Sequence, residues 1–444
     1  MRIAMLTNNY RPFVGGVPIS VERQAQELVK LGHEVTVFAP YYGDTASERE
    51  EMLRADAAAP ERVVRYRTQT RKMDNGMVYP ELFPSEIIRA FENETFDCIH
   101  VHHPMFVGPL GVKLGRKYGI PVIYTCHTRY EDYLHYIPLL RINSGSSNIR
   151  KKAVGWIRRK VIPSYMRWFA DQCDLVLAPS AGMQRVLRGY GMTSRSAVFP
   201  TGLEERFFQT DESRAQEIRK QYGKGKKHLL ITVSRLEKEK NYGFLLRGIA
   251  DIRQRIGDDF HVLLLGEGSQ ESELKVRTSL LGIRDMVTFA GNIPNEEVRD
   301  YLAAADLFLF ASTSETQGIV LAEAFAAGTP VVAVRAVGTD DIIENGVNGF
   351  LTDERESEWA DRAAEILCGD KMEEMKKAAR ASAENYRSCR LAIYEEMLYN
   401  QCICEKLAES RRSAWISGPQ QDGKEEVCYE SEEECGEHSA MAVH

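Results

Sequence analysis

The chain has 444 residues, a net charge of −7 and 43% hydrophobic residues. This length exceeds what a single hydrophobic core serves and predicts two domains with additional segments. No stretch approaches the roughly 18 uninterrupted apolar residues of a membrane-spanning helix, and the apolar stretch at the N-terminus is too short for a secretory signal. Nine cysteines at irregular positions, without zinc-like spacing, predict a cytoplasmic protein with no metal site.

Predicted strands and helices alternate along the chain. A strand at 2–7, a helix at 17–31 and a strand at 34–40 form a βαβ unit. Further strands are predicted at 98–102, 122–126 and 175–179, and a second series at 228–234, 261–266, 287–290, 307–311 and 331–334. We therefore expect an α/β fold with two doubly wound domains. Residues 375–409 predict helix, and 418–444 lack apolar periodicity and predict disorder.

A glycine pair follows the first predicted strand. Gly15 and Gly16 open the first helix, where backbone N–H groups and the helix dipole favour a phosphate. A tight turn without a ligand explains the same pair, so the signal is weak alone.

A charged loop follows the first strand of the second series. Arg235 and Lys240 lie in the run Ser-Arg-Leu-Glu-Lys-Glu-Lys-Asn at 234–241. Arginine offers a planar fork and lysine a point charge, so both suit a diphosphate. The alternative is an ordinary exposed loop, but ligands of open α/β sheets bind at the carboxyl ends of strands.

Two glutamates eight positions apart follow the strand predicted at 307–311. Glu315 falls in the loop after that strand, and Glu323 lies inside the next helix, which Gly328-Thr-Pro330 ends. Carboxylates at this place can accept hydrogen bonds from sugar or ribose hydroxyls. Two solvated glutamates beside a helix N-terminus are the alternative.

Two further segments combine aromatic and polar residues. The run 124–136 places His127 directly after a strand, among tyrosines that suit a sugar or a lipid headgroup. Residues 141–170 hold eight Lys or Arg and no Asp or Glu, and the aromatic spacing at 149–169 predicts an amphipathic helix for an anionic bilayer, with the basic stretch 62–72 beside it. A helix packed on its own domain fits equally well. Nothing resembles a nucleic-acid reading module.

Together these motifs resemble the retaining glycosyltransferases of family four, which have the two-domain GT-B fold. The resemblance rests on motifs in chain order, namely Gly15-Gly16, Pro200-Thr-Gly202, Ser234-Arg235 with Lys240, Gly266-Glu-Gly268, and Glu315 to Glu323. The runs 127–136 and 15–20 are similar to those of bacterial diacylglycerol glucosyltransferases.

This resemblance implies roles for the candidate residues. Arg235 and Lys240 would bind the nucleotide diphosphate, Glu323 the ribose and Glu315 the donor sugar. His127 would hold the donor sugar near its 6-hydroxyl. Backbone N–H groups for the sugar and phosphates would come from two short segments, Gly15 with Gly16 and the run Gly318, Ile319, Val320 and Leu321.

The resemblance also implies the organisation and activity of the whole chain. Two Rossmann-like domains, an acceptor domain at 1–205 and a nucleotide-sugar domain at 206–380, would face a central cleft, with a helix at 381–410 returning to the first domain and an acidic tail at 411–444. We expect transfer of glucose from UDP-glucose to 1,2-diacylglycerol with retention, without a metal or cofactor, at the inner face of the cell membrane. The alternatives are another hexose or acceptor, or a GT-B protein that binds a nucleotide sugar without transferring it.

Overall fold

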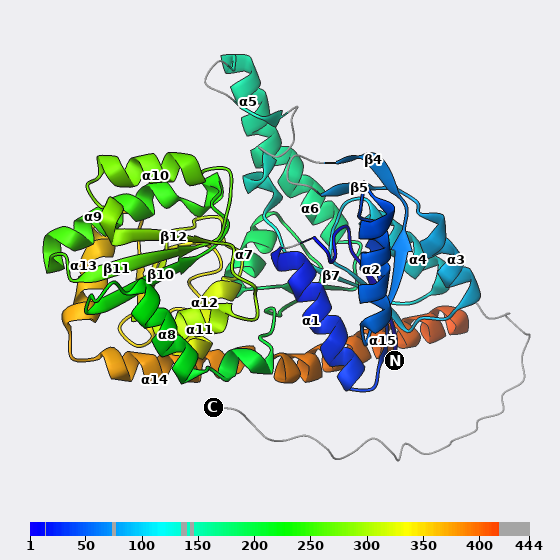
Figure 1. Ribbon diagram of the computed structural model, residues 1–444. Coiled ribbons are helices and arrows are strands. Elements are labelled where there is room, and N and C mark those ends of the chain that lie inside the picture. Colours follow the sequence, from blue (N-terminus) through cyan, green and yellow to red (C-terminus); the bar gives the residue numbers. More distant parts are fainter. Residues whose placement is uncertain (14, 73–76, 135–139, 143–145, 417–444) are drawn as a thin grey trace, which may run out of the picture.

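The computed structural model describes residues 1–13, 15–72, 77–134, 140–142 and 146–416. These residues form two α/β domains side by side, each with a parallel sheet between layers of helices, and a long C-terminal helix that runs along the first domain (Figure 1). The GT-B architecture expected from the sequence is thereby confirmed.

The first domain is built on a seven-stranded parallel sheet of strand order β3-β2-β1-β6-β7-β8-β9. Its central strands are short, mostly apolar runs that are buried on both faces, as is usual in parallel sheets. The strands are β1 (Arg2–Leu6), β2 (Glu34–Pro40), β3 (Arg62–Tyr66), β6 (Cys98–Val101), β7 (Val122–Thr125), β8 (Leu175–Ala178) and β9 (Ser196–Val198). A separate antiparallel pair, β4 (Thr68–Lys72) and β5 (Val78–Pro80), follows β3.

Helices cover both faces of this sheet (Figure 1). They are α1 (Gly16–Lys30), α2 (Ala46–Ala58), α3 (Ser85–Asn93), α4 (Val107–Tyr118) and α7 (Ala181–Gly189). Glycines on α4 let it lie close to the sheet, because a Cβ at Gly111 would meet Val101 at 2.7 Å.

The second domain is built on a six-stranded parallel sheet of strand order β12-β11-β10-β13-β14-β15. Its strands are β10 (His228–Val233), β11 (Phe260–Leu265), β12 (Val287–Gly291), β13 (Leu307–Phe310), β14 (Val331–Val334) and β15 (Gly349–Thr352). Its helices are α8 (Glu212–Tyr222), α9 (Tyr242–Ile256), α10 (Glu271–Leu280), α11 (Val298–Ala304), α12 (Ile319–Ala327), α13 (Glu356–Cys368) and α14 (Met372–Ala383). The sequence did not predict β15, whose four residues lie between loops.

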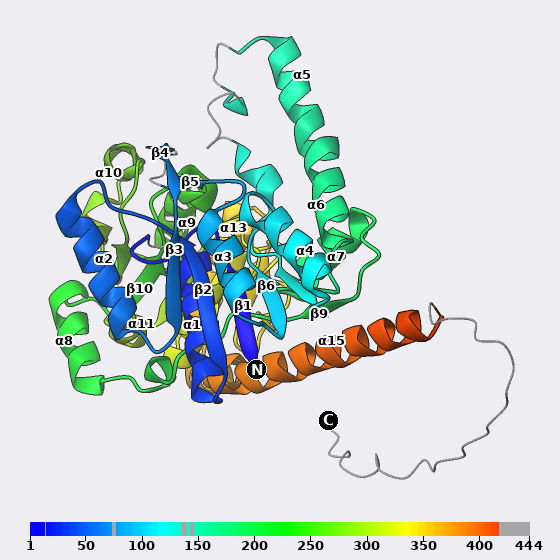
Figure 2. The same cartoon turned by 90° about the vertical axis from the view of Figure 1, so that its right-hand side faces the viewer.

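A long helical segment rises from the first domain. It consists of α5 (Asn148–Trp156), a π-helical turn (Ile157–Val161) and α6 (Ile162–Ala170). The α6 end packs into the domain through Met166 and Phe169, whereas α5 extends away from the body of the molecule (Figure 2). None of the described helices is long and apolar enough to cross a bilayer.

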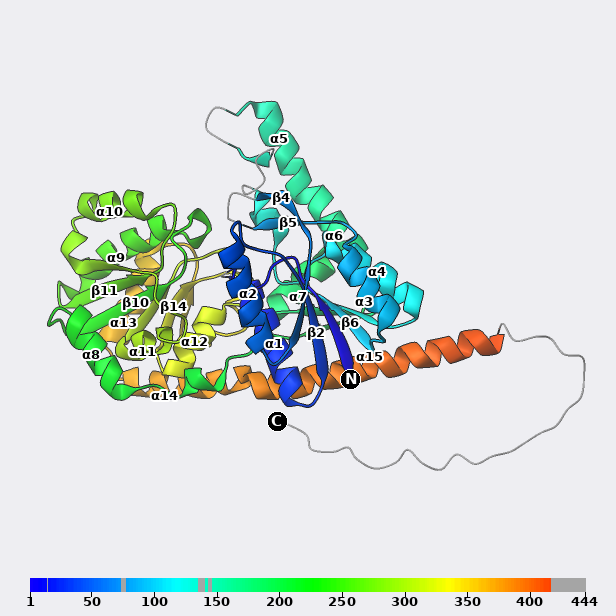
Figure 3. The same cartoon turned by 45° about the vertical axis from the view of Figure 1, so that its right-hand side comes forward.

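The last helix, α15 (Ser388–Ile416), returns to the first domain and packs on α1 (Figure 3). Leu398, Tyr399 and Cys402 belong to the core of the first domain. The Tyr399 hydroxyl lies 2.6 Å from Nδ1 of His100, deep beneath the sheet. The crossing C-terminal helix expected from the sequence is thereby confirmed.

Candidate active site

The loops that follow strands of the two sheets meet at the domain interface. The loop after β13 contacts the first domain through Thr316, whose hydroxyl donates to the carbonyl of His127 at 2.8 Å and whose carbonyl accepts from Ser180 at 2.7 Å. The side-chain amide of Gln317 pairs with both backbone groups of Thr201, at 2.8 and 3.0 Å. Two consecutive residues of this loop, Thr316 and Gln317, are therefore fixed by contacts with the first domain.

Lys240 and Glu315 form an ion pair at this interface. Lys240 closes the 3₁₀ turn Lys238–Lys240 after β10, and its Nζ lies 3.2 Å from Oε2 of Glu315. Burial opposes both charges, but the mutual attraction and hydrogen bond outweigh it, so the pKa of Lys240 is raised and that of Glu315 is lowered. Both groups are charged at neutral pH, so a largely buried ammonium group faces a carboxylate at this interface.

Arg235 lies on the same side of β10, on a loop that glycines hold in place. A Cβ at Gly266 would meet the carbonyl oxygen of Ser234 at 2.1 Å, and one at Gly268 would meet that of Leu236 at 2.4 Å. The Gly-Glu-Gly motif therefore serves to let this loop approach closely. The Arg235 side chain is half exposed and pairs with Glu239 at 3.1 Å.

The N-terminus of α12 places backbone donors beside Glu315. Gly318 caps the helix with φ 82°, and its N–H points to Oε1 of Glu315 at 3.4 Å. The Leu321 N–H is taken by the Gly318 carbonyl, whereas Ile319 and Val320 donate to no backbone carbonyl among the described residues. An anion would meet these two free N–H groups first.

Glu323, the second glutamate of the motif, is bound to the other domain. It lies one turn into α12, is 6% exposed, and contacts Nη2 of Arg23 on α1 at 3.4 Å. Burial raises the pKa of Glu323, and Arg23 partly offsets that effect. Arg23 also donates to Glu204 at 3.0 Å and to the Gly202 carbonyl at 3.0 Å. Glu323 is thus placed by an ion pair across the interface.

Gly16, the second residue of the glycine pair, has open space beside it at the start of α1. A Cβ at Gly16 would meet nothing within 4 Å, so packing inside the protein does not require glycine there. Gly15 has an extended backbone with φ 175°, which any residue adopts. Room at Gly16 suits close approach of a ligand to the helix N-terminus.

His127 follows β7 and is paired with a second histidine. Its Nε2 lies 3.0 Å from Nδ1 of His102, and the rings are stacked with centroids 5.3 Å apart. Burial, reinforced by neighbouring histidines, holds the pKa of His127 well below 6.5. His127 is therefore neutral at physiological pH and has one N–H to donate.

The segment after His127 connects the interface with the basic helix. The 3₁₀ turn Tyr130–Asp132 is tied to that helix by Asp132, which accepts from Arg158 at 2.7 Å. Burial raises the pKa of Tyr133, which also feels the charges of Lys240 and Glu315. His135 and Tyr136 from the same run lie outside the described residues, as does 417–444 of the acidic tail.

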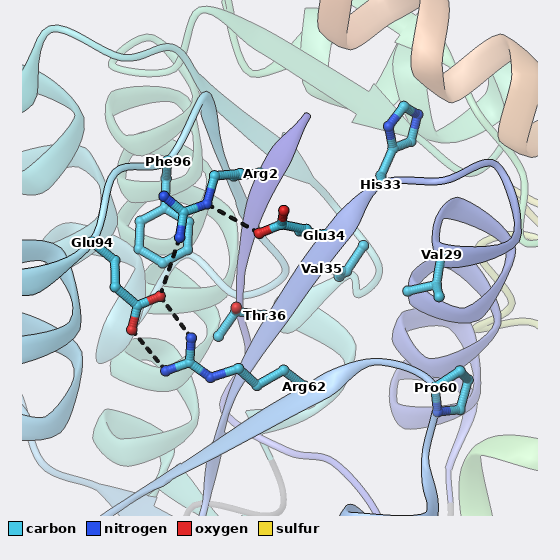
Figure 4. Close-up of a pocket in the computed structure, with 10 residues that line it drawn as sticks. All are labelled: Arg2, Val29, His33, Glu34, Val35, Thr36, Pro60, Arg62, Glu94 and Phe96. Carbon is cyan, nitrogen blue, oxygen red and sulfur yellow. Dashed lines mark hydrogen bonds and ion pairs between the residues drawn. The ribbon is translucent and has the colours of Figure 1, made fainter.

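A cavity at the far end of the first domain is a poor candidate for the site. It measures about 270 Å³ and lies at the opposite, N-terminal edge of the first sheet (Figure 4). Its arginines are already paired, because Arg62 meets Glu94 at 2.6 Å and Arg2 meets Glu34 at 3.2 Å. Among the described residues, no group of three metal-ligating side chains occurs either.

Three residues of the site escaped the sequence-based predictions, namely Arg23, His102 and Gln317. In the sequence, Arg23 occupies an ordinary polar position of an amphipathic helix, and Gln317 lies between two motifs without belonging to either. His102 lies at the end of a predicted strand, so its position alone made it as good a candidate for the site as His127. Their partners lie in other elements, so single-sequence spacing carries no signal for them.

Comparison with known proteins agrees with the architecture. Residues 14–207 match the model of the family described as Glycosyltransferase Family 4, and residues 214–383 match that described as Glycosyl transferases group 1. An alpha-monoglucosyldiacylglycerol synthase of Streptococcus pneumoniae is 31% identical over 79% of this chain and 75% of that protein, and one of Acholeplasma laidlawii is 26% identical over 80% and 86%.

More distant similarities extend the comparison. A GDP-mannose-dependent alpha-(1-6)-phosphatidylinositol monomannoside mannosyltransferase of Mycolicibacterium smegmatis is 26% identical over 79% of this chain and 84% of that protein. The structure of HepE from Anabaena in complex with UDP superposes with a TM-score of 0.66, at 20% identity, covering 92% of this chain and all of the other. With the two-sheet architecture and both family matches in chain order, the chain belongs to the family 4 glycosyltransferases of GT-B fold.

Proposed function

We propose that this protein transfers glucose from UDP-glucose to 1,2-diacylglycerol with retention of the α configuration, at the cytoplasmic face of the membrane. The observation that carries the proposal is the Lys240–Glu315 ion pair at the domain interface, beside an arginine and the free N–H groups of α12. The relatives named for glucosyl-diacylglycerol synthesis support the sugar and the acceptor.

The donor would be bound by an exchange of partners. The diphosphate replaces Glu315 as the partner of Lys240. It also contacts Arg235 and accepts hydrogen bonds from the N–H groups of Ile319 and Val320. Glu315, released from Lys240, then accepts hydrogen bonds from hydroxyls of the sugar. Glu323 accepts from the ribose with the carboxylate oxygen that Arg23 leaves free. The charges of the leaving diphosphate are thereby neutralised by side chains of the protein, without a metal.

The acceptor would be reached from the membrane by the helix α5–α6. Its apolar side chains Ile149, Trp156 and Trp168 are 82%, 59% and 53% exposed, instead of packed on the domain. Arg158 is paired with Asp132, but Lys151, Lys152, Arg159 and Lys160 form no ion pair among the described residues. Exposed tryptophans between unpaired cations suit an anionic bilayer interface.

The same surface continues onto the body of the first domain. A cavity of about 260 Å³ between α4 and α6 is lined by Trp168, Lys113 and Arg116. Lys113 lies over the exposed ring of Phe83, at 5.4 Å from its centroid. This arrangement adds apolar area and two cations to the membrane-facing side of the helix.

A second candidate function is transfer of mannose from GDP-mannose, which the similarity to the mycobacterial mannosyltransferase favours. The proposed site contacts the diphosphate, the ribose and the hexose hydroxyls, which UDP-glucose and GDP-mannose both have. A direct comparison of donors therefore decides between them.

The test is transfer to lipid. The protein is incubated with labelled UDP-glucose, UDP-galactose or GDP-mannose and diacylglycerol vesicles, and the lipid extract is separated. We expect labelled α-glucosyl-diacylglycerol from UDP-glucose. Label from GDP-mannose only would establish the second candidate, and nucleotide-sugar binding without labelled lipid or soluble sugar product would identify a non-catalytic protein.

A further inference from the structure

His102 lies behind His127 and leaves one ring nitrogen without a partner. It follows β6, is 1% exposed, and uses Nδ1 to contact Nε2 of His127 at 3.0 Å. No described group lies within hydrogen-bonding distance of its buried Nε2. The ring of His100 lies against that of His102, tilted by 34°, with centroids 4.1 Å apart.

Both members of the pair are neutral in the folded protein. Burial lowers the pKa of His102 well below 6.5, and His127 has the same shift for the same reason. Each ring therefore carries one proton, and one of these protons lies between Nδ1 of His102 and Nε2 of His127.

His100, the neighbouring histidine, has a partner for each of its ring nitrogens. The Tyr399 hydroxyl donates its one proton to Glu395 at 2.7 Å, so it can only accept from His100 Nδ1 at 2.6 Å. Nε2 of His100 lies 2.7 Å from the Thr125 hydroxyl. Every polar atom of that ring is satisfied, in contrast to His102.

The unpaired Nε2 of His102 indicates which of the two rings donates the shared proton. If His127 donated, His102 would carry its proton on Nε2, and a buried N–H would have no acceptor. An unsatisfied buried N–H is rarer and costlier than an unsatisfied lone pair. The cheaper arrangement has His102 donating through Nδ1–H, with only the Nε2 lone pair left bare.

We propose that His102 is a positioning residue that holds His127 as the Nδ1–H tautomer, so that His127 presents a hydrogen-bond donor to the substrate. His127 is half-buried and its Nε2 is engaged by His102, which leaves Nδ1 as the ring nitrogen for a ligand. A donor there meets an oxygen of the sugar or the leaving diphosphate. The opposite tautomer would present a lone pair and suit a hydroxyl proton instead.

The direct test is the tautomer itself, which requires no sugar transfer. In the full chain labelled with ¹⁵N-histidine, two-bond ¹H–¹⁵N correlations distinguish protonated from unprotonated ring nitrogens, and His127→Gln assigns the His127 signals. We expect a protonated Nδ1 and a bare Nε2 on His127. A protonated Nε2 on His127 would overturn the proposal even if the enzyme transfers glucose as expected.

Substitutions separate this role from a packing role. His102→Leu keeps the volume but removes the donor, so His127 should lose the fixed Nδ1–H tautomer and kcat/KM should fall about tenfold, the worth of one hydrogen bond. His102→Asn places an amide N–H near the former Nδ1 and should restore both the tautomer and kcat/KM to within about threefold. Equal losses in both variants, with His127 unchanged, would contradict the proposal.

A control histidine comes from the second domain. His261 is also buried and contacts Thr288 through Nε2 at 2.8 Å. His261→Asn should leave the His127 signals unchanged. Circular dichroism of all variants reports whether they remain folded, and the His102→Asn tautomer decides the question even if His102→Leu unfolds.

Discussion

Single residues at this site act through the partners that the fold gives them. The positions of Lys240 and Glu315 could be predicted from the sequence because each lies in the loop that follows a strand, and strand ends of one sheet gather at one edge. Their ion pair at 3.2 Å could not, since it joins loops 75 positions apart in sequence. Arg23 and His102 remained hidden for the same reason, because their partners lie on other elements.

Removing Lys240 tests the diphosphate role. Lys240→Ala should lower kcat/KM for UDP-glucose about a hundredfold or more, because the leaving group loses a charge that neutralises it. Lys238→Ala is the matched control, since Lys238 lies exposed on the same 3₁₀ turn. Steady-state rates of both variants are compared at equal folded concentration. Near-normal turnover of Lys240→Ala would remove Lys240 from the mechanism.

For the helix α5–α6, the sequence predicted the element but not its surroundings. Its aromatic and basic spacing predicted an amphipathic helix but could not say what covers the apolar side. The structure divides it, because Phe169 and Met166 are buried at the α6 end while Trp156 is exposed. The intervening π turn changes the helical register, so residues on either side need not face one way.

Membrane binding by this helix can be tested by sedimentation with vesicles containing anionic phospholipid. Replacing Trp156 with Ser, and Arg159 and Lys160 with Glu, should abolish co-sedimentation, since the interface loses an aromatic anchor and about 1 kcal/mol per removed cation. Sedimentation in these variants equal to that of the wild type would return the helix to a structural role.

The control for that experiment changes charge and apolar area elsewhere by the same amount. Leu280 on α10 is 82% exposed, and Lys371 and Lys377 lie exposed near and on α14. A variant with Leu280→Ser, Lys371→Glu and Lys377→Glu should sediment like the wild type. A loss in both triple variants would indicate that only net charge matters.

At the scale of the whole molecule, contacts between the domains hold the candidate site residues in place. The α/β class and the two doubly wound domains follow from the alternation of strand and helix patterns in the sequence, whereas the crossing helix α15 was implied by the resemblance to the family 4 glycosyltransferases. The relative placement of the domains depends on pairs such as Arg23 with Glu323 and Gln317 with Thr201, which no local pattern encodes.

The Arg23–Glu323 pair allows a double-mutant test of that placement. Arg23→Met leaves a buried carboxylate unpaired and should destabilise the protein by about 3 kcal/mol. Adding Glu323→Gln should recover most of that loss, because no buried charge then remains. Urea unfolding of the two single variants and the double variant gives the coupling energy. A value near zero would show that the ion pair does not join the domains.

Stability should also depend on pH through the buried histidines. The pKa of His103 is lowered to about 3 by burial, and those of His102 and His127 also lie well below 6.5. Below pH 6.5 the unfolded chain binds protons that the folded protein does not, so stability is complete above that pH and falls as pH drops. Glu323, with a raised pKa, acts in the opposite sense but is a single group.

We therefore expect the urea concentration at the midpoint of unfolding to decrease as the pH is lowered from 7.5 to 5.5. His103→Gln should weaken this dependence on pH. The unfolded chain then has one histidine fewer that binds a proton which the folded protein does not bind. A midpoint that stays constant or rises on acidification would contradict the burial of these rings.

The central claim is that this interface transfers a hexose to a membrane lipid. The most direct measurement is formation of glycolipid from labelled UDP-glucose and diacylglycerol vesicles, with the anomeric configuration of the product read by proton NMR. The account predicts α-glucosyl-diacylglycerol from the wild-type protein and almost none from Lys240→Ala. Wild-type protein that binds UDP-glucose but leaves the lipid extract unlabelled would contradict it.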